Sequence, residues 1–301
     1  MWRRSFLSYK EKYEQTFVPE TRDEKSRVRI DQCSSLSELK KRFGISTTAT
    51  TTAEEEQEDD DDEDDDRGSN EDDRDPVPET GFTIWDASLL LAAYLERKEK
   101  MEAFLLPARA AAGAPNSGSR GLGVVELGAG TGAGTLLLVE SVEKMKGNDD
   151  NDDVRFVVTD LGACLHLLRH NVRESRMSSV VSVARLEWGA TRREKDLERV
   201  KNLLSPSRNI DLVIGADLCY TSNEDVIKNL AATVKMCGSR ACVMAFCREH
   251  NPKAVDLFET LSEDTFEVKK VTNSDPSWPE HMRDDSDDFV IFEMTRRDAS
   301  T

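Results

Sequence analysis

The residues with the clearest chemical potential form a glycine-rich turn after an apolar segment. Residues 124–127 read Val-Val-Glu-Leu, and glycines follow at 128, 130 and 132. Branched residues around one acid predict the end of a buried strand, and the alternating glycines predict a sharp turn into a helix. Because glycine has no Cβ, such a turn lets backbone approach a ligand closely. Gly128, Ala129 and Gly130 are therefore candidate contacts for a nucleotide-like cofactor.

Chemically useful side chains also follow three later segments that have the pattern of strands. They are Asp160, Trp188, and the pair Asp217 and Tyr220. A carboxylate at a strand tip, one strand–helix–strand unit after a glycine turn, can accept hydrogen bonds from both hydroxyls of a ribose. The ring face of Trp188 is large enough to form one side of a pocket for a nucleotide base. The alternative is that Trp188 packs in the core. Asp217 and Tyr220 are expected where the strand order reverses and a substrate meets the cofactor.

Composition argues against two classes of partner. The net charge of −18 over 301 residues is local, because residues 54–75 hold sixteen acids and two arginines. The chain lacks the basic face that a nucleic-acid-binding protein needs, so we expect no nucleic-acid partner. No run of eighteen apolar residues is present, so we expect no membrane partner. The six cysteines form no CxxC pair and most lie in apolar segments. This pattern predicts buried thiols in a reducing compartment, a cytoplasmic or cytoplasmic and nuclear location, and no metal site.

From residue 81 onward, strand and helix patterns alternate. This alternation predicts parallel strands, right-handed crossovers and helices on both faces of one sheet. The last two predicted strands, 266–271 and 289–294, have no helix between them and should pair antiparallel. The predicted fold is α/β, a doubly wound and mostly parallel seven-stranded sheet with an antiparallel closing pair. A capping-box pattern at 222–225 and Asn251-Pro252 predict where two of the helices begin.

The chain is expected to have three parts. Residues 1–45 form an N-terminal extension with a short strand, 46–80 an acidic insert, and 81–301 the α/β domain. The insert is Thr-rich, then acidic, and ends with two prolines. Such a composition cannot bury enough apolar surface to offset its ordering entropy, so we predict a disordered linker. The alternative role for this acidic segment is to attract basic protein partners.

Four motifs, in this order, resemble those of the seven-strand S-adenosylmethionine-dependent methyltransferases, a class I, Rossmann-like fold. The closer resemblance is to the methyltransferase-like protein-lysine methyltransferases that act on non-histone proteins. The motifs are Gly81-Phe82-Thr83-Ile84-Trp85-Asp86-Ala87, residues 125–132, Thr159-Asp160, and Gly215-Ala216-Asp217-Leu218-Cys219-Tyr220. The resemblance covers about 81–297, and 27–32 resembles the family's N-terminal strand. The chain departs from the family pattern at Ala133-Gly134-Thr135 and in a longer charged helix between Gly189 and Ile210.

The resemblance implies S-adenosylmethionine as the cofactor and a protein substrate that presents a lysine. It implies that Asp217 and Tyr220 are the catalytic residues. The cofactor-binding residues that it implies are Trp85, Gly128, Ala129, Gly130, Asp160, Trp188 and Ala216. Ala216 is small enough to admit the adenosyl or methyl-donor region.

The acceptor chemistry limits what Asp217 can do. A lysine must be neutral to attack a methyl group, and its ordinary pKa is about 10.4, so neutralising it near pH 7.4 costs roughly 4 kcal/mol. A carboxylate nearby raises that pKa further. We therefore expect Asp217 to orient the substrate nitrogen or the cofactor. Tyr220, neighbouring aromatic rings and the cofactor's positive charge should favour the neutral amine.

Other functions remain open from the sequence. Gly128, Gly130 and Ala133 also fit a dinucleotide fingerprint, which suggests an NAD-dependent oxidoreductase but leaves Asp217 and Tyr220 unexplained. A cofactor-binding scaffold without activity is the non-enzyme alternative. Within methyltransferases, arginine, histidine or a small molecule could replace lysine as acceptor. Nothing in the sequence requires an oligomer, so we expect a monomer.

The connection between the last two predicted strands is acidic. It contains Asp275, Glu280, Asp284, Asp285, Asp287 and Asp288. If 266–271 runs parallel to the other strands, the connection leaves the sheet at the cofactor edge. We then expect it to attract a lysine-rich substrate segment, with a solubilising hairpin tip as the alternative.

Overall fold

The computed structural model describes residues 16–17, 28–33, 41, 79–105, 121–145, 154–189, 193–204, 209–283 and 286–297. Almost all of the predicted insert and most of the N-terminal extension lie outside these ranges, so the predictions made for them stay predictions. Among the described helices, none has both the length and the apolar character needed to span a bilayer.

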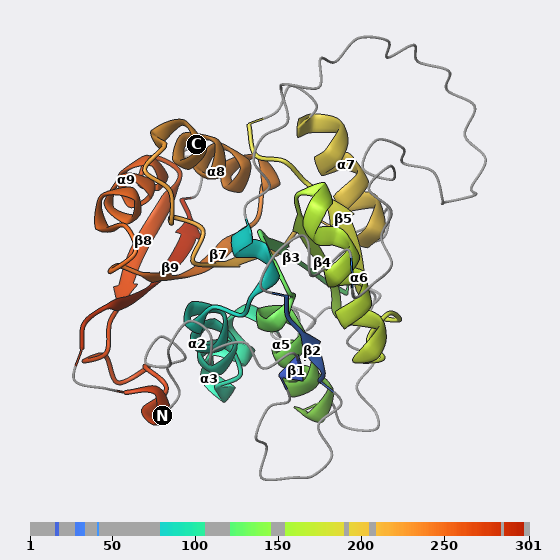
Figure 1. Cartoon of the computed structure of the whole chain (residues 1–301). Coiled ribbons are helices and arrows are strands. Elements are labelled where there is room, and N and C mark those ends of the chain that lie inside the picture. Colours follow the sequence, from blue (N-terminus) through green and yellow to red (C-terminus); the bar gives the residue numbers. More distant parts are fainter. Residues whose placement is uncertain are drawn as a thin grey trace, which may run out of the picture.

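Seven strands form one sheet in the order β5-β4-β3-β6-β7-β9-β8 (Figure 1). The five strands β5, β4, β3, β6 and β7 are parallel to their neighbours. β9 lies between β7 and β8 and is antiparallel to both. This arrangement confirms the predicted fold class, including the closing pair. The strands are β3 (Leu122–Leu127), β4 (Val154–Asp160), β5 (Val181–Arg185), β6 (Leu212–Ala216), β7 (Ala241–Cys247), β8 (Phe266–Val271) and β9 (Phe289–Arg296).

Successive residues of the central strands pack into two different helical layers. Val124 and Ile214 join the core that contains α2, α5 and α6, whereas Val125 and Val213 join the core that contains α7, α8 and α9. Side chains alternate between the faces of a strand, so a sheet covered on both faces needs apolar residues at nearly every position. The helices are α2 (Asp86–Leu95), α3 (Lys98–Lys100), α5 (Ala133–Met145), α6 (Leu165–Glu174), α7 (Arg193–Leu204), α8 (Glu224–Cys237) and α9 (Pro252–Ser262).

The strand order reverses between β3 and β6. From β3 the chain crosses to β4 on one side, and from β6 it crosses to β7 on the other. Leu127 of β3 pairs with Gly215 of β6, so the glycine turn and the Asp217 segment leave the sheet side by side. A crevice at such a reversal is the usual ligand site of an open α/β sheet.

Local sequence sets the starts of the helices after β6 and β7. Asn251 accepts a hydrogen bond from the Ala254 amide (3.1 Å), and Pro252 occupies the first turn of α9, as the sequence predicts. The predicted capping box before α8 is wrong by one residue. Asn223 is the cap, and its side chain accepts from the Asp225 amide two residues later (3.0 Å), which satisfies one of the unpaired amides of the first turn.

The N-terminal strand β2 (Ile30–Asp31) pairs with β1 (Thr16–Phe17) and docks on α6. Its backbone is held by Asn171, which is fully buried. The Asn171 side chain accepts from the Asp31 amide (2.9 Å) and donates to the Asp31 carbonyl (3.1 Å) and the Thr131 carbonyl (2.9 Å). A single amide side chain therefore joins the N-terminal strand, α6 and the glycine turn.

The acidic connection between β8 and β9 begins and ends at the carboxyl edge, because β8 runs parallel to β7. Its middle, however, folds back over the helical layer. Trp278 is buried, and its carbonyl accepts from the Arg97 guanidinium (3.1 Å) at the end of α2. Asp275 accepts bonds from the amide and hydroxyl of Ser277 (2.7 and 2.6 Å).

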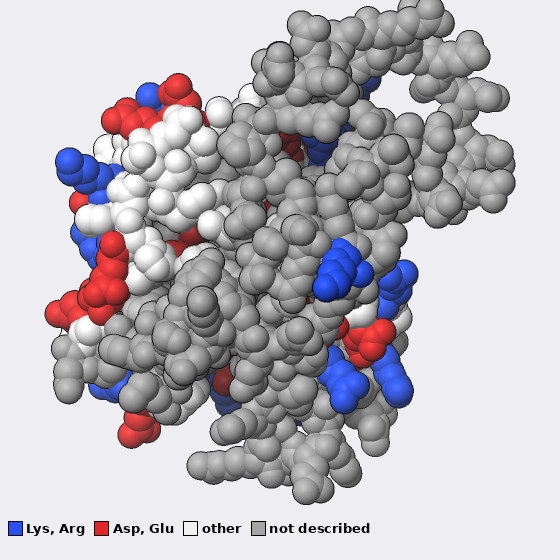
Figure 2. Space-filling view, in the orientation of Figure 1, with Lys and Arg blue, Asp and Glu red and all other residues white. Residues whose placement is uncertain are grey.

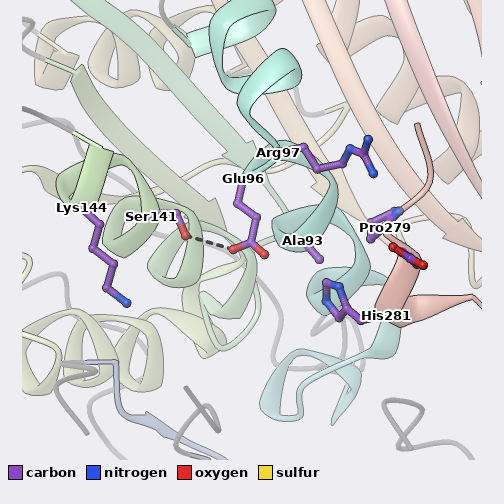
Figure 3. A pocket seen from close by; sticks show the side chains of 8 residues that line it. Ala93, Glu96, Arg97, Ser141, Lys144, Pro279 and His281 are labelled. Carbon is purple, nitrogen blue, oxygen red and sulfur yellow. Dashed lines mark hydrogen bonds between the residues drawn. The ribbon is translucent and has the colours of Figure 1, made fainter. Parts of the chain in front are cut away.

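A shallow hollow of about 380 Å³ lies beside this connection. It is lined by Ala93, Glu96, Arg97, Ser141, Lys144, Pro279, Glu280 and His281 (Figure 3). Since α5 starts at the glycine turn and runs for 13 residues, about 20 Å, its last turn lies near the opposite edge of the sheet. Glu280 thus lies away from the predicted site. Asp284 and Asp285 are outside the described residues.

Replacing Asn171 by alanine should lower the free energy of unfolding by about 1–3 kcal/mol, because it removes the side-chain partner of the buried Thr131 carbonyl and of the partly buried backbone groups of Asp31. Urea unfolding measures the change. Asn202→Ala, at an exposed position of α7, is the matched control and should have little effect. Equal effects in both variants would contradict the assigned role of Asn171.

Candidate functional site

The glycine turn adopts backbone conformations that favour glycine. Gly128 and Gly130 have φ of 56° and 55°. A Cβ at Gly128 would lie 2.6 Å from a Leu218 methyl and 3.1 Å from the Trp188 ring, and one at Gly130 would lie 3.1 Å from the Gly81 carbonyl oxygen. Any larger residue would therefore push apart the groups that surround the turn.

Asp160 ties β4 to this turn. Its Oδ2 accepts from the Gly130 amide and its Oδ1 from the Leu161 amide, each at 2.7 Å. Burial raises the pKa of the carboxyl group, and these hydrogen bonds partly offset the effect. The Cys164 thiol is a third hydrogen-bond partner of this carboxyl group. Because a carboxylate offers about four acceptor positions, Asp160 can brace the turn and still accept from one ribose hydroxyl.

Glu126, to which the sequence analysis gave no role, is a second buried acid beside the turn. Its Oε2 accepts from the Thr135 amide (3.3 Å) at the start of α5. Burial raises the pKa of Glu126 to about 7, and the nearby charge of Asp160 adds to the shift. Two buried acids beside an open-backbone turn fit a cationic ligand such as S-adenosylmethionine, because a positive charge stabilises the ionised carboxylates.

The other predicted cofactor contacts lie at the same edge. Trp188 follows β5, borders Gly128 and also packs on the core of the α7–α9 layer, so both roles considered for it are compatible. Trp85 precedes α2, and its Nε1 donates to the Thr80 carbonyl (2.8 Å). Ala216 ends β6 and is buried.

Asp217 is held tightly at the end of β6. It has φ of 57°, a left-handed conformation that is uncommon for a residue with a side chain. Its Oδ1 accepts from the Cys247 amide (3.1 Å) and its Oδ2 from His250 Nδ1 (2.7 Å). Only 6% of the side chain is exposed. The carboxylate therefore faces the end of β7.

Tyr220 has different neighbours from Asp217. Its hydroxyl is hydrogen-bonded to the Thr80 side chain, and the residue is 40% exposed. Burial raises the pKa of Tyr220, the hydrogen bond to Thr80 partly offsets this effect, and the charge of Asp160 adds to it. The two expected catalytic residues therefore lie on different sides of the site, Tyr220 toward Asp160 and Asp217 toward His250.

His250 is the main residue of this edge that sequence reasoning missed. Its hydrogen bond to Asp217 raises its pKa to about 10, with a further contribution from Cys247. His250 is therefore an imidazolium at neutral pH. The sequence does show a histidine shortly after the strand that ends at Cys247. This position indicates a site residue only once it is known that this strand lies beside β6.

A family model described as lysine methyltransferase matches residues 70–264. The chain belongs to this lysine methyltransferase family. The predicted site residues of the chain, whose individual roles stay predictions, lie at or just after the carboxyl ends of β3, β4, β5 and β6, with Trp85 beside them.

The chain is similar to two named proteins. It is 31% identical over 172 residues to the protein-lysine N-methyltransferase EFM3 of Saccharomyces cerevisiae, covering 55% of this chain and 44% of EFM3. It is 30% identical over 203 residues to the protein N-lysine methyltransferase METTL21A of Mus musculus, covering 66% of this chain and 74% of that protein. The solved methyltransferase domain of METTL16 is 11% identical with a TM-score of 0.42, covering 66% of each chain.

Gly130→Ala should weaken S-adenosylmethionine binding by roughly tenfold or more, because a left-handed conformation costs a side chain about 1–2 kcal/mol and the new Cβ meets the Gly81 carbonyl. Isothermal titration calorimetry measures the affinity. Gly162→Ala is the control, since a Cβ there meets nothing within 4 Å. An unchanged affinity in Gly130→Ala would rule out this part of the site.

Glu126→Gln should flatten the pH dependence of stability. The folded pKa of Glu126 is raised from 4.5 to about 7, so its contribution to stability is complete below pH 4.5 and is lost as the pH rises through 7. Glutamine keeps the shape and cannot ionise. Urea unfolding between pH 5 and 8 should show a smaller loss for this variant than for the wild type, whereas Glu198→Gln, at an exposed position, should follow the wild type.

Proposed function

We propose that this lysine methyltransferase transfers a methyl group from S-adenosylmethionine to a lysine side chain of a protein substrate. The observation that carries the proposal is the pairing of β3 with β6, which sets the glycine turn beside the Asp217 segment. A cofactor held on the turn would meet an acceptor bound over Asp217 and Tyr220. Family membership and the two relatives named for protein lysine methylation support a lysine as the acceptor.

The cofactor half of the site fits S-adenosylmethionine. When bound, this cofactor supplies an electrophilic methyl group on a positively charged sulfur. Gly128, Ala129 and Gly130 would hold its methionine part through backbone, and Asp160 would accept from its ribose. Trp188 and Ala216 would border the adenosyl group, with Trp85 closing the site. The buried acids Glu126 and Asp160 complement its positive charge.

The acceptor half must receive a neutral amine. The bound cofactor would supply the methyl group, and the amine that accepts it would release its proton to solvent. Tyr220 and Trp85 offer rings that remove water from the amine, which favours its neutral form. Asp217 is unsuited to act as the general base, because both of its oxygens already accept hydrogen bonds within the protein.

We also propose that the chain acts as a monomer in the cytoplasm or in the cytoplasm and nucleus, without nucleic-acid or membrane partners. All six cysteines are buried and none forms a disulfide, which is typical of a reducing compartment. On the face shown in Figure 2, basic and acidic side chains lie next to one another over α9 and β8. Ion pairs there include Lys270–Glu259 (2.7 Å) and Arg248–Asp256 (2.9 Å).

The deciding experiment identifies the methylated amino acid. The protein is incubated with methyl-labelled S-adenosylmethionine and cell lysate, and the protein fraction is hydrolysed. We expect label in methyl-lysine, lost in Asp217→Ala at unchanged cofactor affinity. Asp264→Ala, an exposed aspartate at the end of α9, is the control and should keep the label. Label in arginine or histidine would show that this residue, and not lysine, is the acceptor. The absence of protein label would favour a small-molecule acceptor or a scaffold without activity.

A further inference from the structure

His250 occupies a position that the proposed function does not use. It lies in the turn between β7 and α9, next to the end of β6. Its Nδ1 donates to Asp217 Oδ2 at 2.7 Å, and its side chain is 36% exposed. Its ring meets the Trp85 ring edge-on, with 5.4 Å between centroids and 79° between planes. The imidazole therefore joins a cofactor-site residue to an expected catalytic residue.

Asp217 without His250 would present a buried, negatively charged group to the acceptor. A carboxylate within about 4–6 Å of a lysine raises the pKa of that lysine by about 1–3 units. Such a shift would work against the neutral amine that methyl transfer requires. An imidazolium at 2.7 Å cancels most of this field, because at a distance the pair acts as a dipole rather than as a single charge.

The ion pair with Asp217 is the main electrostatic interaction of His250. Asp217 reaches it from β6, Cys247 from the end of β7, and the uncharged Trp85 ring from the start of α2. Of the charged side chains nearby in sequence, Arg248 pairs with Asp256 on α9. Glu249 is exposed.

We infer that His250 is a positioning residue for the methyl transfer, which holds the Asp217 carboxylate at the end of β7 and neutralises it, so that the bound lysine can lose its proton. This inference rests on the proposed function, because it requires an amine acceptor. It also explains how an aspartate can stand beside the acceptor without favouring the inactive ammonium form.

The first test needs no substrate. Nuclear magnetic resonance of the four histidine rings follows their titration, and His250→Asn assigns the signal of His250. We expect His250 to stay protonated above pH 8, and to titrate at lower pH in Asp217→Asn. Titration near pH 6.5 in the wild type would overturn the inference, since Asp217 would then be unneutralised at neutral pH.

The second test follows the rate of methyl-lysine formation against pH, with lysate protein and S-adenosylmethionine at saturation. The acidic limb of this profile reports the pKa values of ionisable groups in the complex of enzyme, cofactor and substrate. His250→Asn keeps a hydrogen-bond donor but loses the positive charge, so it should move the limb to higher pH by about 1–3 units. The double variant Asp217→Asn/His250→Asn removes both charges but, unlike Asp217→Ala, keeps the side-chain size and one acceptor at position 217. The limb of its remaining activity should therefore return to the wild-type position. His281→Asn, in the hollow at the far edge, is the control.

The outcomes separate the two claims. A slower His250→Asn enzyme with an unmoved limb would mean that His250 is merely structural and would overturn the inference while leaving lysine methylation intact. A shifted limb that the double variant fails to restore would also overturn it. Wild-type label in an amino acid other than lysine would overturn the proposed function and, with it, the inference.

Discussion

The parallel pairing of β3 with both β4 and β6 is the constraint on which the rest of the site depends. It places three carboxyl ends side by side, so that the glycine turn has Asp160 on one flank and Asp217 on the other. At this reversal of strand order, the connections from β3 and β6 run to opposite sides of the sheet, which opens a crevice between their ends. Cofactor and acceptor groups can therefore meet there, although they are far apart in sequence.

The cofactor half and the acceptor half of the site differ in how their buried carboxyl groups are compensated. Glu126 and Asp160 have carboxyl groups whose pKa burial raises, and within the protein they are satisfied by backbone amides. Such acids are costly until a cation arrives, which suits the positively charged cofactor that we propose for this half of the site. Asp217 instead carries its own counter-ion in His250. An internal counter-ion suits a half that must receive an amine without holding its proton.

Segments outside the sheet keep the turn in place. Asn171 links the turn to β2, and Gly81 packs against Gly130 from the segment that precedes α2. The glycine turn is therefore clamped by parts of the chain that lie about 50 residues before it or 40 residues after it. The N-terminal strand, although short, is part of the support of the site rather than an appendage.

The sequence by itself determined the order of strands and helices, the antiparallel closing pair, the Asn251 cap and the strand-end positions of Asp160 and Asp217. These features rest on local periodicity and on residues adjacent along the chain, which a sequence displays directly. Only the tertiary structure decided that Tyr220 turns toward Thr80, that Glu126 is a buried acid of raised pKa, and that His250 pairs with Asp217. Each of these depends on which strands and loops become neighbours in space. Burial and pairing across strands come from non-local packing, which no local pattern in this chain encodes.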